Sequence, residues 1–145
     1  YLTMEDKNLI MYEYLKSYEP LQGILQFNAL AQETSKVSLN TVSSDDVLKS
    51  YTSGDKLMQY DFAIQMLKQH DSDGISTINI EQMYDAQLFM NWIKEQNKNK
   101  NFPTFPGVLK IENLQDEPDL AGVQEGNLAK YMFQCRVIYY MEKEE

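Results

Sequence analysis

The fold is decided by the stretch VLKSYTSGDKLMQYDFAIQMLK, residues 47–68. Gly54 lies near its centre and readily adopts the positive φ angle that a tight loop requires. After this loop, apolar residues occupy every second position, as in a strand with one buried face: Met58, Tyr60, Phe62, Ile64 and Met66. The stretch therefore predicts a β-hairpin over 47–68, with Gln59, Asp61 and Gln65 exposed to water on the opposite face.

The same period-two pattern predicts further strands on both sides of the hairpin. It occurs over residues 37–41, 108–114 and 129–141. The last of these segments is the longest, and Phe133 lies on its apolar face. Residues 21–34 have a mixed pattern, in which residues 23–27 are compatible with either a short strand or a turn of helix. We expect an acidic loop between the last two strands.

Two helices are expected, one before and one after the hairpin. The first covers residues 3–18, where Thr3 and Asp6 have the spacing of a helix cap and Pro20 follows the end. The second covers residues 79–96. Its apolar residues recur at helical spacing and form one stripe: Met83, Ala86, Phe89, Met90, Trp92 and Ile93.

The order of these elements predicts an α+β fold. Successive strands are joined by loops too short for a crossover, which favours antiparallel pairing. We therefore expect a mainly antiparallel sheet of about four to five strands with two helices packed on one face. The length of 145 residues matches a single domain, 1–145.

Composition and charge narrow the class of protein. A hydrophobic content of 43% is enough for a folded core. The net charge of −9 disfavours binding to nucleic acid phosphates. Cys135 is the only cysteine, so no intramolecular disulfide forms and synthesis in a reducing cytoplasm is expected. No run approaches the roughly 18 apolar residues of a membrane span, and we expect a soluble protein.

Residue types that carry catalysis are scarce. His70 is the only histidine, which excludes any metal site that needs two imidazoles, and as a loop residue beside Asp71 it is expected to be solvated. Residues 71–74 lack the ligands of a calcium loop. Cys135 falls on the apolar face of its strand, which predicts a buried thiol. We therefore expect no catalytic residue, no metal and no cofactor, and a protein that is not an enzyme.

The hairpin resembles that of small bacteriophage proteins known as minor capsid proteins or tail terminators. In that family a strand ends in a Tyr-x-x-Gly turn and returns as Tyr-x-Phe, a motif that lies here within residues 49–62. The resemblance extends over about residues 37–141. It includes a Trp-Ile pair, a Phe-Pro element and a closing strand with spaced aromatic residues: Trp92, Ile93, Phe102, Pro103, Tyr131, Phe133 and Tyr139.

The resemblance implies a structural virion protein. Members of the family form a ring, typically a hexamer, at the head-proximal end of the phage tail, where they stop tube growth and take part in head-tail joining. The implied partners are copies of the chain itself, the tail tube protein and the head connector protein. DNA would pass through the ring without specific binding, and no membrane is implied. The implied location is the virion, after assembly in the bacterial host cytoplasm.

The hairpin loop is the candidate subunit interface, because a ring subunit needs a rigid projecting element to meet its neighbour. The candidate residues are Tyr51, Thr52, Ser53, Gly54 and Asp55. Two alternatives stay open. The chain is compatible with another phage head-tail connector or minor capsid subunit, and with a non-phage soluble protein-binding adaptor.

Overall fold

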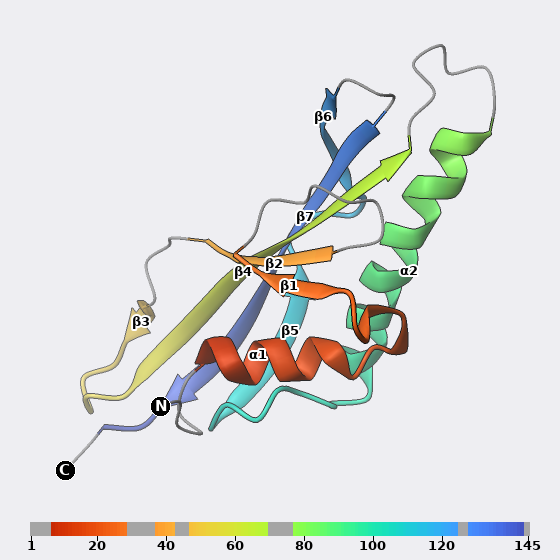
Figure 1. Ribbon diagram of the computed structural model, residues 1–145. Helices are drawn as coiled ribbons and strands as arrows, with labels where there is room; N and C mark the ends of the chain where they lie inside the picture. The colour runs from red at the N-terminus through yellow and green to blue at the C-terminus, as the bar shows by residue number, and fades with distance from the viewer. Residues whose placement is uncertain (1–6, 29–36, 43–46, 70–76, 125–127, 144–145) are drawn as a thin grey trace.

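The protein consists of one mixed β-sheet with two α-helices on one face (Figure 1). The computed structural model describes residues 7–28, 37–42, 47–69, 77–124 and 128–143. Its elements follow one another in this order: α1 (Lys7–Lys16), the short 3-10 helix η1 (Glu19–Leu21), β1 (Leu25–Phe27), β2 (Val37–Thr41), β3 (Val47–Ser50), β4 (Lys56–Gln69), α2 (Ile78–Lys98), β5 (Val108–Asn113), β6 (Asp119–Gln124) and β7 (Leu128–Met141).

The two longest strands, β4 and β7, form the centre of the sheet. They pair antiparallel over their whole length, from Lys56 opposite Met141 to Gln69 opposite Leu128. β2 and β3 share the other edge of β4, while β5 and β6 share the other edge of β7. β1 extends the sheet beyond β2 and is parallel to it. The predicted hairpin is therefore present, and its second strand runs the full length of the sheet.

The predicted sheet of about four to five mainly antiparallel strands is wrong in its strand count, because the described sheet has seven strands and one parallel pair. β1 has only three residues, too few to show a period of two. β6 occupies part of the segment expected as a loop. Its register shifts between Leu120 and Gly122, and such an irregularity breaks the alternation on which the strand prediction depends.

Both helices differ from their predicted bounds by a turn or less where they are described. α1 ends at Lys16, and Ser17 and Tyr18 then form a turn with bonds to the carbonyl three residues back. The predicted cap of the first helix lies outside the described residues. α2 covers Ile78–Lys98 instead of 79–96, and Thr77 is the residue before its first turn.

The core lies between the helices and the inner face of the sheet. β4 contributes Phe62 and β7 contributes Phe133, and both side chains are buried. Phe89 of α2 meets Phe133 edge-on, with ring centroids 5.6 Å apart. α1 adds Met11 and Leu15 to the same cluster. Both helices therefore cover one face of the sheet, as predicted, and the predicted apolar face of β4 is confirmed.

The prediction that the other face of β4 is exposed to water is wrong at its centre. Gln59 and Asp61 are only 7% and 8% exposed, and Ala63 and Leu67 on the same face are buried as well. Gln65 is half-buried. Alternation identifies which residues share a face of the sheet. Whether that face is buried depends on the neighbouring strands and on other segments of the chain that pack over it. A strand at the centre of a sheet can thus have two buried faces.

Gly107, just before β5, is a point where the backbone tolerates no side chain. Its φ angle is +74°, and a Cβ atom there would lie 2.3 Å from the carbonyl oxygen of Tyr140. We expect Gly107→Ala to lower the free energy of unfolding by about 1–3 kcal/mol from backbone strain alone, with the clash adding to it. Gly23→Ala is the control, because Gly23 has a similar φ of +79° but open space around it. Equal losses in urea denaturation of the two variants would contradict this reading.

Candidate functional site

The hairpin loop between β3 and β4 is the predicted interface, and its backbone is well ordered by hydrogen bonds. The amide of Gly54 donates to the carbonyl of Tyr51 at 3.0 Å, and the amide of Tyr51 donates to the carbonyl of Asp55 at 3.0 Å. Gly54 has a φ of +94°, which confirms the reason for a glycine in this loop. Tyr51, Thr52, Ser53 and Gly54 are exposed, whereas Asp55 is half-buried.

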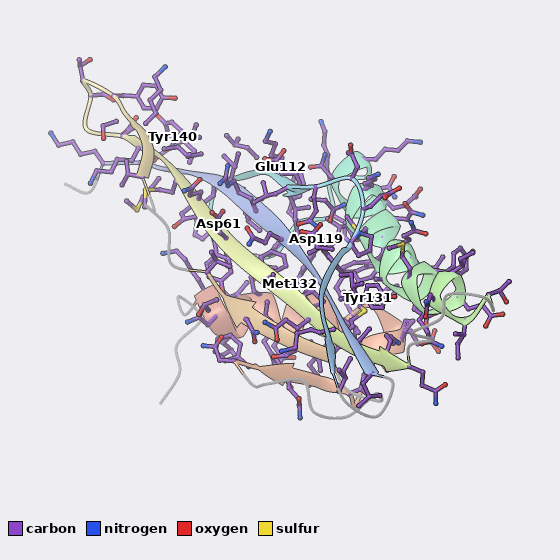
Figure 2. All side chains as sticks on the ribbon, turned by 90° about the horizontal axis from the view of Figure 1, so that it is seen from above. Asp61, Glu112, Asp119, Tyr131, Met132 and Tyr140 are labelled. Atoms are coloured by element: carbon purple, nitrogen blue, oxygen red, sulfur yellow. The ribbon has the colours of Figure 1, made fainter. Side chains whose placement is uncertain are left out.

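Asp55 joins the hairpin to the end of β7, more than 80 residues away in the chain. Its carboxylate accepts hydrogen bonds from the hydroxyl of Tyr140 and, at 2.7 Å, from the amide of Lys143. The bond from Tyr140 is the main reason why the pKa of Asp55 is lowered, and the same bond raises the pKa of Tyr140 to about 12. Figure 2 shows Tyr140 at the base of the hairpin loop. Asp55 therefore stabilises the hairpin internally and is not available as a free contact residue.

This carboxylate makes the hairpin attachment sensitive to acid. Because the pKa of Asp55 lies below its ordinary value of 3.8, the stabilisation is present above 3.8 and is lost as the pH falls through the lowered pKa. We expect the NMR chemical shift of the Lys143 amide to titrate with a midpoint below 3.8. Asp55→Asn is the control, since an amide keeps an acceptor oxygen but does not titrate. A midpoint at or above 3.8, or the same titration in the control, would contradict the assignment.

The end of the hairpin exposes apolar side chains beside a cation. Leu48 is 42% exposed, and Tyr51 and Met141 are each 38% exposed. The ammonium group of Lys49 lies 5.3 Å from the centre of the Tyr51 ring, within cation–π distance. We call this surface the hairpin tip and define it by residues 48–54 together with Met141. It combines a tight loop, apolar side chains and positive charge.

A second exposed apolar surface lies on α2, and the sequence analysis missed it. Ile80, Tyr84 and Leu88 follow one another at four-residue spacing and are 71%, 56% and 39% exposed. We call these three residues the α2 stripe. The predicted core stripe of the same helix is confirmed at Ala86, Met90 and Ile93, which are buried, while Met83 is half-buried. The spacing of 80, 84 and 88 was a visible signal, but it cannot be recognised as exposed until the buried face is known.

A row of charges crosses the outer face of the sheet. Asp61 of β4 lies opposite Arg136 of β7, which in turn lies opposite Glu112 of β5. Arg136 donates two hydrogen bonds to the Asp61 carboxylate, at 2.7 Å from Nε and 3.2 Å from an Nη atom. These bonds raise the pKa of Arg136. Figure 2 shows Asp61 and Glu112 on their separate strands. Asp61, which was predicted to be exposed to water, is therefore a buried member of an ion pair.

Cys135 is fully buried, as predicted. Burial raises the pKa of its thiol, which donates a hydrogen bond to Oδ1 of Asn113 at 3.3 Å. Such a thiol is unreactive, because only the thiolate is a good nucleophile. His70 and residues 71–74 lie outside the described residues.

A cavity of about 330 Å³ opens beside β4, between the segments that pair with β3 and β2. Lys7, Tyr139 and Asp61 are among its lining residues. Lys7 lies over the ring of Tyr139, and Asp61 is already paired with Arg136, so the charged groups of this cavity have partners within the chain.

The described residues were also considered for a metal site and for a membrane-spanning helix. Across the described ranges, no three His, Cys, Asp or Glu side chains are grouped so that they could hold a metal ion. None of the helices in the part of the chain that the structure describes is long and apolar enough to cross a membrane. Comparison of the sequence with models of known protein families and with curated proteins yields no match.

Proposed function

We propose that the chain is a structural subunit that assembles into a ring and acts as a phage tail terminator. In this role the ring stops growth of the tail tube and joins the tail to the head connector. The observation that carries the proposal is the hairpin tip, which lies at one end of the sheet with its apolar residues exposed. The resemblance of residues 49–62 to the hairpin of that phage family supplies the specific role.

The hairpin tip has the properties of an assembly contact. Its conformation is set by the Gly54 turn and by the attachment of Asp55 to Tyr140, so little entropy is lost when it is bound. Its exposed Leu48 and Tyr51 supply apolar area, and tyrosine is among the residues enriched at binding hot spots. A rigid apolar projection of this kind favours a macromolecular partner over a small substrate.

The charge of the chain suits a ring through which DNA passes. With a net charge of −9, the surface repels phosphates and does not retain DNA by release of counterions. A tail channel requires that property, because genome transfer would be slowed by adhesion to the wall.

Electron microscopy of the purified full chain, alone and mixed with phage tail tubes, tests the proposal. We expect closed rings of uniform size, and we expect these rings at one end of the tubes. Analytical ultracentrifugation gives the subunit number independently. A chain that stays monomeric at all accessible concentrations and leaves tube ends unoccupied would overturn the proposal.

A charge placed in the hairpin tip should prevent assembly without unfolding the subunit. We expect Leu48→Asp to leave the circular dichroism spectrum unchanged and to abolish rings and tube capping, because a carboxylate would be desolvated in a packed contact. Phe27→Asp is the matched control, since Phe27 is 38% exposed on β1 and lies outside the tip. Intact rings of Leu48→Asp would exclude the hairpin tip as the contact, and loss of rings in Phe27→Asp as well would contradict the assignment of assembly to the tip alone.

A further inference from the structure

The hairpin tip and the α2 stripe lie at opposite ends of the molecule. The hairpin tip adjoins Lys56, at the start of β4, whereas Lys68, near the end of β4, forms an ion pair at 3.3 Å with Asp85 of α2. A strand rises about 3.3 Å per residue, so the two surfaces are separated by about 40 Å. Figure 1 shows the same arrangement, with the β3–β4 hairpin and the first turns of α2 at opposite ends of the sheet. One subunit cannot bring its own two apolar surfaces together.

The charges around the two surfaces are complementary. Lys49 lies against Tyr51, and Lys56 is exposed next to the loop. On α2, the exposed Glu81 lies one turn before Tyr84, while the carboxylate of Asp85 already forms the ion pair with Lys68. At the tip, Asp55 is bonded to Tyr140 and to the Lys143 amide, and Glu142 follows Met141, so Lys49 and Lys56 are the cations that could meet Glu81 of another copy. Opposite charges across a contact favour this pairing and disfavour pairing of either surface with itself.

We infer that the hairpin tip of one copy of this chain docks on the α2 stripe of the next copy. The inference rests on the proposed function, because it describes the contact by which the ring forms. Contact between two different surfaces of identical subunits is heterologous, and repetition of such a contact closes into a ring when the rotation permits. A contact between two hairpin tips would instead bring lysines together and leave the α2 stripe exposed.

A second copy is the partner that the observations favour, since one contact covers both the hairpin tip and the α2 stripe and brings Lys49 near Glu81. An exposed apolar surface with polar borders marks an interaction site in soluble proteins. The α2 stripe has such borders, and Tyr84 at its centre is 56% exposed. The competing partner for the α2 stripe is a tail tube or connector protein. Cross-linking between two copies of the chain distinguishes this partner from a second copy.

Cysteine cross-linking tests the contact in the full-length chain, and the native cysteine does not interfere because Cys135 is fully buried. Thr52→Cys marks the hairpin tip, and Asn91→Cys marks the helix surface one turn beyond Leu88, both at exposed positions. The variants are mixed in equal amounts and treated with a short bismaleimide. We expect a covalent dimer in the mixture and none with either variant alone, because a heterologous contact joins unlike positions.

Thr52→Cys mixed with Thr41→Cys is the matched control, since Thr41 is exposed at the end of β2, opposite Phe62 of β4, and is not part of the α2 stripe. Rings seen by microscopy without a cross-link between positions 52 and 91 would overturn this contact and leave the proposed function standing. A dimer formed by Thr52→Cys alone would also overturn it, in favour of tip-to-tip pairing. Absence of rings in the unmodified chain would overturn the proposed function and this inference together.

Charge reversal gives an independent readout of the same contact. We expect Lys49→Glu to weaken ring assembly about tenfold, because it places like charges opposite each other. Glu81→Lys added to the same chain should restore assembly, since it re-creates an opposite pair across the contact. Unaltered assembly of Lys49→Glu, or no recovery in the double variant, would count against the docking of the hairpin tip on the α2 stripe.

Discussion

Phe133→Ala should lower the free energy of unfolding by about 3–5 kcal/mol, the range observed when a large buried aromatic residue is truncated. Phe133 is 1% exposed and packs edge-on against Phe89 of α2. Truncation would remove this aromatic contact and leave a cavity between the sheet and the helix. Phe62→Ala on the neighbouring strand should have an effect of the same size, because Phe62 is 0% exposed.

Urea denaturation followed by circular dichroism measures both losses. Phe27→Ala is the matched control, because it removes the same ring from a position that is 38% exposed at the edge of the sheet. We expect a clearly smaller loss for this variant. Wild-type midpoints for Phe62→Ala and Phe133→Ala would mean that the assignment of inner and outer strand faces is inverted.

Arg136→Ala should be similarly damaging, although Arg136 is outside the apolar core. The Asp61 side chain is 6% exposed and receives both of its strong hydrogen bonds from Arg136. Removal of the guanidinium leaves a buried carboxylate uncompensated, which costs about 3–5 kcal/mol. The double variant Asp61→Ala with Arg136→Ala should recover much of this loss, since no unpaired charge then remains.

A double-mutant cycle with the two single variants and the double variant measures the coupling between these residues. Lys110→Ala is the control, because the Lys110 and Glu112 side chains are 46% and 32% exposed and such a pair contributes at most about 1 kcal/mol. If Arg136→Ala cost no more than Lys110→Ala, the Asp61–Arg136 pair would have no special role in stability.

The hairpin loop was only partly predictable as a site. Its position and its need for Gly54 follow from the local sequence, because a tight turn between two alternating segments demands a residue that tolerates positive φ. The role of Asp55 does not follow, since its partners Tyr140 and Lys143 are 85 and 88 residues away. A substitution that reversed the charge of Asp55 would therefore disturb the fold as well as any interface. Leu48 and Thr52 are better positions at which to test the interface.

The α+β class, the apolar faces of β4 and β7 and the burial of Cys135 could all be predicted from the order of residues along the chain. These features follow from the periodicity of apolar residues, because the spacing along a helix or strand determines which side chains point to the same face. The parallel pairing of β1, the pairing of β6, the burial of Asp61 and the exposure of the α2 stripe could not be predicted in this way. Those features depend on which distant segments lie beside each residue, and no local pattern encodes that information.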